Sequence, residues 1–259
     1  MKIAVCVKEV PEAGPGRRMD PATKRIDRSG ERALNSYDLN AVEEALRIKD
    51  AAGGGEVVLI SMGQEKALES IRKALAMGAD RAVLISDPGA AGSDLVATST
   101  VLATAIAAES AELVLFGQSA QDSDGAVLWA AVADRLEMPV VSQVSELTIS
   151  GGTITAKRQT EFGYDTIQTG TPAVLAVSDA LNEPRYPSLK GIMGAKKKPQ
   201  DIKSLADIGV DASKAGEAGS RTTVSAVNPP PSRGDTIKIE DDGTAAQKIL
   251  EFLVERKFA

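Results

Sequence analysis

Histidine is absent from this 259-residue chain, and cysteine occurs once, at Cys6. Without histidine, neither a Ser-His-Asp nor a Cys-His nucleophilic centre can form, and the commonest metal ligand is missing. A single cysteine excludes an intramolecular disulfide and a zinc or iron–sulfur centre built on several cysteines. Acid–base catalysis would therefore depend on a carboxyl group or lysine whose pKa is shifted toward neutrality. These absences favour a binding or carrier role over an enzymatic one.

Long apolar stretches and a surplus of positive charge are also missing. No window of about 18 apolar residues occurs, so we expect no transmembrane segment. The first residues have no signal-peptide layout, which makes a cytoplasmic location the expectation. The 30 basic residues against 36 acidic ones give a net charge of −6, which argues against nucleic acid as a partner. The length suits one large α/β domain, or one domain and an arm.

Short apolar runs alternate with helical patterns through most of the chain. Runs rich in Val, Ile and Leu predict buried strands at 3–7, 57–61, 82–85, 113–116 and 173–177. Apolar residues at helical spacing predict helices at 39–51, 64–77, 93–109 and 124–136, with Gly78 as a C-cap. Such alternation is typical of an α/β fold with a doubly wound, mostly parallel sheet.

Two regions depart from this alternation. Residues 140–168 alternate apolar and polar side chains around Gly151-Gly152, which predicts an antiparallel hairpin beside the main sheet. Beyond residue 199 the chain is polar, contains three successive prolines and ends in an amphipathic segment at 244–258. We therefore divide the chain into an α/β domain, 1–199, and a C-terminal arm, 200–259. The pattern leaves open whether the arm lies across a partner subunit or folds back on its own domain.

Ligands of such sheets bind beyond the carboxyl ends of the strands. Three predicted loops lie there: from Lys8 to Asp38, 61–63 and 116–125. The third contains serine and other small residues before a predicted helix, which suits a phosphate held by backbone N–H groups and the helix dipole. Alternatively, Ser123 or Asp124 only caps that helix. Neither a P-loop motif nor G-x-G-x-x-G is present, and Cys6, within a predicted strand, is most simply a small core residue.

A second informative stretch is 181–198. Leu189, Ile192 and Met193 form an apolar stripe at helical spacing, flanked by lysines. One interpretation is an ordinary helix that covers the sheet. The other is a protruding hydrophobic anchor for a partner's pocket. Periodicity cannot separate the two.

Several segments resemble the β-subunits of electron transfer flavoproteins. The most specific is 182–198, with the sequence NEPRYPSLKGIMGAKKK. It is joined, in the family's order and spacing, by 41–45 (AVEEA), 71–80 (IRKALAMGAD) and 172–174 (PAV). The resemblance extends from about residue 3 to residue 199, and the arm matches only in style. It implies an α/β nucleotide-binding domain similar to the adenine-nucleotide α-hydrolases.

The resemblance also implies a heterodimer with an α-subunit that holds the redox-active FAD, while this chain holds AMP and has no catalytic residue and no metal. The implied AMP contacts are Cys6, Asn35, Ser36, Tyr37, Asp38, Met62, Gly117, Gln118, Ser119, Ala120, Gln121, Asp122, Ser123, Asp124, Gly125, Ala126, Val127 and Leu128. The implied recognition loop, 184–198, would bind acyl-CoA or related dehydrogenases through Leu189, Ile192 and Met193. Electrons would pass through the α-subunit's FAD to an electron transfer flavoprotein–quinone oxidoreductase of the membrane.

This sequence departs from the family pattern in the predicted hairpin, where Phe162 and Asp165 stand in place of the usual residues. Bifurcating relatives, which hold a second FAD instead of AMP, typically have Thr-x-Gln-Val after the acidic residues of the third loop. Residues 125–128 are instead GAVL, so we favour AMP. An enzyme similar to ATP pyrophosphatases would need a serine- and glycine-rich loop after the first strand, but EVPEA stands there.

Overall fold

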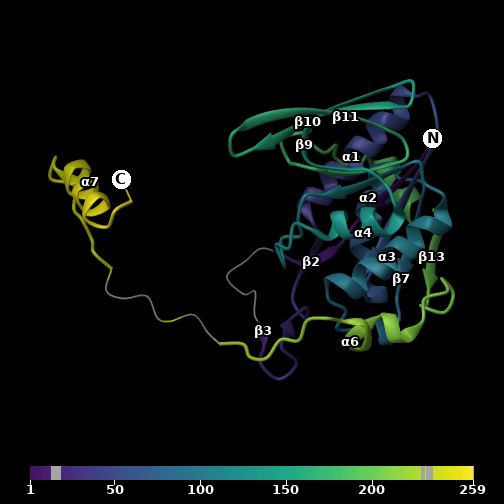
Figure 1. Ribbon diagram of the computed structural model, residues 1–259, viewed down its shortest axis with the longest axis horizontal. Coiled ribbons are helices and arrows are strands. Elements are labelled where there is room, and N and C mark those ends of the chain that lie inside the picture. The colour runs from purple at the N-terminus through teal and green to yellow at the C-terminus, as the bar shows by residue number, and fades with distance from the viewer. Residues whose placement is uncertain (13–18, 229–230, 232–235, 259) are drawn as a thin grey trace. The chain divides into compact units, whose positions relative to one another are not determined.

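The structure is a computed structural model that describes residues 1–12, 19–228, 231 and 236–258 (Figure 1). It divides into two compact units, Met1–Ser225 and Ala226–Ala259. The first unit contains every strand of the described residues, and the second contains the last helix, α7 (Ala245–Glu255). Within the described ranges, no helix is long and apolar enough to cross a membrane.

The first unit is built on a nine-stranded sheet with the order β11-β10-β9-β12-β8-β1-β6-β7-β13. Neighbours from β9 to β13 in this order pair in parallel, which confirms the predicted α/β class with a mostly parallel sheet. The parallel strands are β1 (Lys2–Cys6), β6 (Glu56–Met62), β7 (Arg81–Ile85), β8 (Leu113–Gly117), β9 (Val140–Ser150), β12 (Ala173–Val177) and β13 (Gln200–Lys203).

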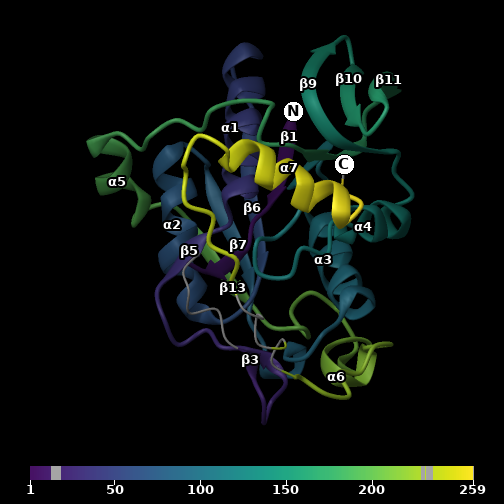
Figure 2. The ribbon, with the colours of Figure 1, turned by 90° about the vertical axis from the view of Figure 1, so that its left-hand side faces the viewer.

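Both faces of the central part of this sheet, from β12 to β7, are buried because successive side chains of these strands enter different cores. Ile3 and Val5 of β1 pack in one cluster, and Ala4 and Cys6 pack in the other. Helices α1 (Ser36–Ala51) and α2 (Leu68–Met77) cover the first face, and α3 (Leu95–Glu109) and α4 (Leu128–Leu136) cover the second (Figure 2). Two covered faces explain why the central strands are unbroken apolar runs.

Helix α2 shows how closely the apolar pattern follows the packing. Its apolar residues Ile71, Ala74 and Leu75 are fully buried. Gly78 ends the helix at φ 143°, a conformation that suits glycine, and its N–H donates to the carbonyl of Leu75, so the predicted C-cap is confirmed.

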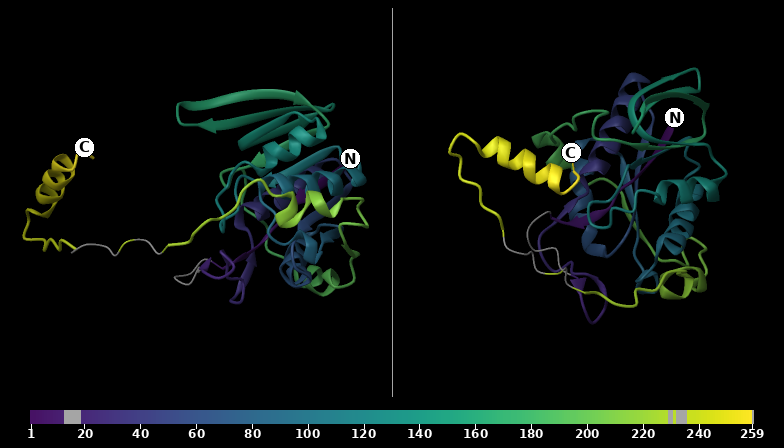
Figure 3. Two further views of the ribbon diagram at one scale, coloured as in Figure 1. Left: turned by 60° about the horizontal axis from the view of Figure 1, so that its bottom comes forward. Right: turned by 60° about the vertical axis from the view of Figure 1, so that its left-hand side comes forward.

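The predicted hairpin is a three-stranded antiparallel extension. Strand β9 runs on past the parallel core, β10 (Thr153–Thr160) returns beside it, and β11 (Gly163–Gly170) forms the sheet edge (Figure 3). Ile154 and Ala156 of β10 are fully buried and extend the first core. Two small ribbons, β2 (Glu9–Pro11) with β5 (Arg32–Leu34) and β3 (Met19–Asp20) with β4 (Arg25–Ile26), follow β1.

The predicted boundary at residue 199 is corrected by the structure. Strand β13 pairs with β7 in register, so residues 200–203 belong to the main sheet. The chain then packs on the first unit through η3 (Ala212–Lys214) and α6 (Gly216–Gly219) as far as Ser225. Sequence alone missed this because an edge strand that is exposed on one side has a polar composition, QDIK. The remaining short elements are η1 (Glu65–Ala67), η2 (Pro88–Ala90) and α5 (Leu189–Ala195).

Candidate functional site

The three predicted loops meet at one edge of the sheet. They follow β6, β1 and β8, which are direct neighbours and run in parallel. Their carboxyl ends therefore lie side by side, in the position where open α/β sheets bind ligands. Met62 ends β6, Cys6 ends β1, and Gly117 ends β8.

Asn35 joins two of these loops. It is fully buried, and its backbone N–H donates to the carbonyl of Lys8 over 2.9 Å. Its Nδ2 donates to Asp38 Oδ1 (2.9 Å) and to the Ser119 carbonyl (2.8 Å), while its Oδ1 accepts from the Gln121 N–H (3.0 Å). One amide side chain thus fixes the loop after β8 against the start of α1. A buried amide with these partners is costly to replace, because each loses its own hydrogen bond.

Gly117 allows the end of β8 to approach the first turn of α1 closely. A Cβ atom on Gly117 would lie 2.5 Å from Asp38 Oδ1 and 2.7 Å from Tyr37 Cβ, so no larger residue fits without movement of the backbone. Asp38 Oδ2 accepts from the Lys8 N–H over 2.8 Å. Burial raises the pKa of Asp38 to about 7, although hydrogen bonds from Asn35, Lys8 and Gly117 oppose this shift.

Asp122 forms two ion pairs that tie the loop to distant parts of the chain. Its side chain has no solvent exposure, and its two oxygens lie 2.7 Å from Lys8 Nζ and 2.5 Å from Arg28 Nη2. Burial alone would raise the pKa of Asp122, but the hydrogen bonds and charges of Lys8 and Arg28 outweigh it, so the pKa is lowered. Two cations share this carboxylate, and the charge of Lys8 also acts on the neighbouring Asp38.

The segment after Asp122 remains open to solvent. Residues 123–127 are exposed, and Asp124 and Ala126 have left-handed φ values of 48° and 47°. These values prevent a right-handed helix there, so α4 begins at Leu128 and not at the predicted residue 124. Neither Ser123 nor Asp124 caps it, since Val127 is the N-cap and has no side-chain cap bond. The capping interpretation is wrong.

The backbone around the start of α4 offers free donors. Within the described part of the chain, no protein acceptor pairs with the N–H groups of residues 125–129. Together with the positive end of a nine-residue helix, these groups can bind an anion such as phosphate.

The remaining predicted contacts differ in accessibility. Cys6 faces the core beneath α3 and α4, and burial raises the pKa of its thiol, which agrees with a core role and not with a thiolate nucleophile. Met62 and Tyr37 are half-buried at the same edge, and Ser36 is exposed. The structure therefore places all predicted nucleotide residues at or beneath the carboxyl edge of three adjacent strands.

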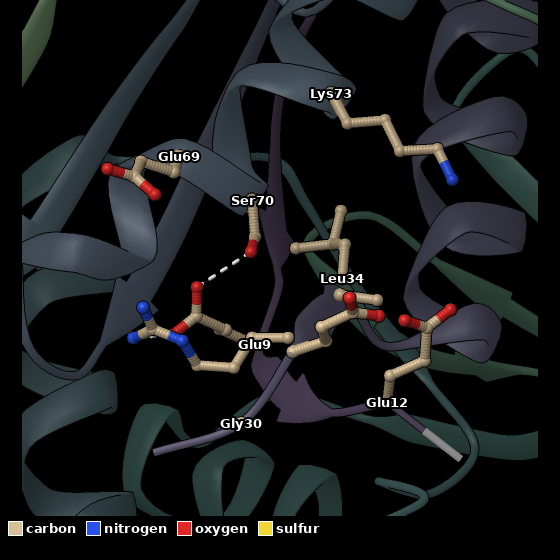
Figure 4. A pocket seen from close by; sticks show the side chains of 10 residues that line it. Glu9, Glu12, Gly30, Leu34, Glu69, Ser70 and Lys73 are labelled. Carbon is tan, nitrogen blue, oxygen red and sulfur yellow. Dashed lines mark hydrogen bonds and ion pairs between the residues drawn. The ribbon is translucent and has the colours of Figure 1, made fainter. Parts of the chain in front are cut away.

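A separate groove lies between the β2–β5 ribbon and α2, with a volume of about 510 Å³ (Figure 4). Its inner wall is Glu9, which accepts from Ser70 Oγ (2.6 Å) and pairs with Arg32 Nη1 (3.2 Å). None of the predicted nucleotide contacts lines it.

The apolar stripe of 181–198 points outward. It lies on α5, where Leu189, Ile192 and Met193 are 76%, 55% and 71% exposed. A helix that covered the sheet would bury these residues, so that interpretation is wrong. A Cβ atom on Gly191 would lie 2.2 Å from the Ala76 carbonyl oxygen, which shows that the backbone side of α5 is pressed against the end of α2.

Lys8 and Arg28 lie within the first predicted loop, but no sequence pattern marked them as partners of Asp122. Arg28 lies 94 residues from Asp122 in sequence and Lys8 lies 114 residues away, so no local spacing connects them. The only available signal was the position of Lys8 directly after a predicted strand.

Comparison with known proteins identifies the family. The family model for the electron transfer flavoprotein domain matches residues 23–208. The electron transfer flavoprotein subunit beta of Mycobacterium tuberculosis (strain ATCC 25618 / H37Rv) is 40% identical over 261 residues, covering 98% of both chains. The chain belongs to the β-subunit family of electron transfer flavoproteins. Its role is therefore in electron transfer, as one subunit of a flavoprotein.

Two further relatives show the breadth of this family. The subunit beta of Thermoanaerobacterium thermosaccharolyticum is 39% identical and is matched over 99% of both chains. The caffeyl-CoA reductase-Etf complex subunit CarD of Acetobacterium woodii is also 39% identical, over 99% of this chain and 97% of the relative. The predicted family is thus confirmed over nearly the whole length, including the arm.

We expect Asp122→Asn to lower the free energy of unfolding by roughly 1.5–3 kcal/mol, because Lys8 and Arg28 lose a charged acceptor. Urea unfolding followed by circular dichroism measures this loss. Asp124→Asn is the matched control, since Asp124 is exposed and Asn tolerates its left-handed backbone. An equal loss in both variants would contradict the importance of the Asp122 ion pairs.

Asp38 predicts a pH dependence of stability. Because its folded pKa is raised, the unfolded state ionises first, and the contribution of Asp38 to stability falls as pH rises from about 4 to about 7. In Asp38→Asn this loss is removed. The difference in unfolding free energy, variant minus wild type, should therefore increase with pH across that range and level off above it. A difference that stays constant with pH would contradict the raised pKa.

Proposed function

We propose that this chain is the AMP-binding β-subunit of a cytoplasmic heterodimeric electron transfer flavoprotein. In this proposal the α-subunit holds FAD, which supplies the redox chemistry. The β-subunit holds AMP at the carboxyl edge of its sheet and presents a docking surface. Electrons pass from acyl-CoA or related dehydrogenases through the heterodimer to a quinone oxidoreductase of the membrane.

The observation that carries the nucleotide part is the loop after β8. Its N–H groups at residues 125–129 are free, and the cations Lys8 and Arg28 lie beside it, where both pair with Asp122. Both features suit a phosphate monoester, which needs donors and positive potential but no catalytic base. The buried links through Asn35 hold the loop in shape before any ligand binds.

The partner α-subunit is suggested by the second unit of the chain. Helix α7 buries none of its residues, and Ile249, Leu250 and Val254 are each about half exposed. An isolated amphipathic helix of 11 residues is marginal in water, so α7 needs an apolar surface to cover it. We propose that the α-subunit provides this surface, with an arm that begins after Ser225.

Co-expression with an α-subunit tests the proposal. We expect a yellow heterodimer that, after denaturation and chromatography, releases one FAD and one AMP. Two FAD and no AMP would instead assign the bifurcating type, and a well-folded monomer without flavin would overturn the heterodimer.

If a dehydrogenase docks on the exposed residues of α5, we expect Leu189→Ala to slow electron delivery from that dehydrogenase to the flavoprotein. Loss of an exposed anchor residue typically costs about 2 kcal/mol or more of binding energy, so KM for the flavoprotein should rise at least about tenfold. Steady-state reduction of the heterodimer by an acyl-CoA dehydrogenase measures this change. Flavin content and unfolding temperature should be unchanged, because Leu189 is 76% exposed. An unchanged KM would remove α5 from the docking surface.

A further inference from the structure

The segment that leads from β12 to α5 is fastened along α1. Asn182 Nδ2 donates to the Asn40 carbonyl (3.1 Å) and to Glu44 Oε2 (3.0 Å). In return, Asn40 Nδ2 donates to the carbonyl of Asn182 over 2.7 Å. This reciprocal pair fixes the start of the segment on the second turn of α1.

Three residues later, Arg185 makes a second attachment. Its N–H and Nε donate to Glu43 Oε2 over 3.1 and 2.8 Å, and its Nη2 donates to Glu43 Oε1 over 3.1 Å. Nη1 also reaches Asp50 Oδ2 at 3.1 Å. The Glu43 side chain is only 5% exposed, whereas Arg185 is 37% exposed. Burial alone would raise the pKa of Glu43, but the hydrogen bonds and charge of Arg185 reverse this and lower it.

The far end of the segment is fixed independently. Ser188 Oγ accepts from the Gly191 N–H over 3.0 Å and so caps α5. Lys198 Nζ donates to the carbonyls of Leu75 (2.8 Å) and Ala79 (2.6 Å) at the end of α2. Helix α5 is therefore capped at its start and attached to the end of α2 just after its own end.

Between these attachments, Tyr186 extends into solvent with 92% exposure. It is continuous along the chain with the exposed residues of α5. An apolar body with a hydroxyl tip is the kind of side chain that dominates protein interfaces. Two rigid attachments reduce the conformational entropy that this surface would lose when a partner binds.

Stability alone is a poor explanation for the buried Glu43. Taking a carboxylate out of water costs free energy that its ion pair only repays, and an apolar residue of similar size often stabilises a fold equally well. What the ion pair adds is a fixed geometry. Arg185 is bound to Glu43 through its backbone N–H and through Nε and Nη2 of its planar guanidinium, so its side chain has one orientation. That geometry places Tyr186.

We propose that Glu43 and Arg185 form a positioning clamp that presents Tyr186 together with the apolar face of α5 to the dehydrogenase partner. This inference rests on the proposed function, because it assigns the same docking surface. It adds Tyr186 as a contact residue, and it adds Glu43 and Arg185 as positioning residues that do not themselves touch the partner. A partner of this class is supported by the similar caffeyl-CoA reductase-Etf complex subunit, whose name describes an assembly with a CoA-dependent reductase.

The clamp is tested in the purified heterodimer with an acyl-CoA dehydrogenase as electron donor. Arg185→Gln should raise KM for the flavoprotein about tenfold while kcat stays within about twofold, because positioning of the surface is lost and the flavin is untouched. Tyr186→Ala should raise KM about fivefold or more in the same way. Arg185→Lys keeps the positive charge but loses the planar guanidinium that bonds to Glu43 through two nitrogens. Its KM should therefore stay well above that of wild type.

Arg47→Gln is the matched control. Arg47 Nε also donates to Glu43, over 3.1 Å, but it lies on α1, and no hydrogen bond or ion pair joins it to the described residues 182–198. Its substitution removes a cation from the same carboxylate and leaves the bonds to Arg185 in place, so KM should equal that of wild type. Hydrogen exchange of residues 183–192 should accelerate in Arg185→Gln and not in Arg47→Gln.

The outcomes separate the two proposals. If Leu189→Ala raises KM but Arg185→Gln and Tyr186→Ala do not, the clamp is overturned and docking through α5 remains. If none of the three changes KM, the docking surface itself is wrong. If the rise in KM of Arg185→Gln is accompanied by a clear loss of flavin content or a clear fall in unfolding temperature, the ion pair is structural. The positioning role is then overturned.

Discussion

The close approach of β8 to the first turn of α1 determines the geometry of the carboxyl edge. Gly117 permits this contact because any side chain there would collide with Asp38 and Tyr37. Asn35 then uses the short distance to bind the loop after β8 through its amide. The exposed N–H groups at the start of α4 lie on the same loop, whose earlier residues Ser119 and Gln121 are held by Asn35.

Charge is distributed in a way that suits binding more than catalysis. The carboxylate of Asp122 is paired with two cations, and Glu43 is paired with Arg185. Of the groups at the carboxyl edge, Asp38 has a pKa near neutrality, but it is buried and its oxygens are occupied by protein donors. This agrees with membership in a family of electron-carrier subunits, in which the protein supplies shape and the flavin supplies reactivity.

The sequence predicted the strands of the parallel sheet and its helices well, because two buried faces require unbroken apolar strands and helices with one apolar side. It failed where tertiary contacts decide the structure. The polar β13 is a strand because β7 offers it an edge, and α4 starts late because Asp124 and Ala126 adopt left-handed backbones. The site loops could be located from strand ends, but the partners of Asp122 could not, since they come from distant parts of the chain.

Helix α1 serves two surfaces on successive turns. Asp38 belongs to the carboxyl edge of the sheet, whereas Asn40 and Glu43 hold the segment that leads to α5. Each residue of an α-helix is rotated by about 100° from the one before it. A one-residue insertion between Asp38 and Asn40 would therefore swing Glu43 away from Arg185 while leaving the first turn in place. The number of residues between Asp38 and Asn40 is thus constrained by the two surfaces that α1 serves.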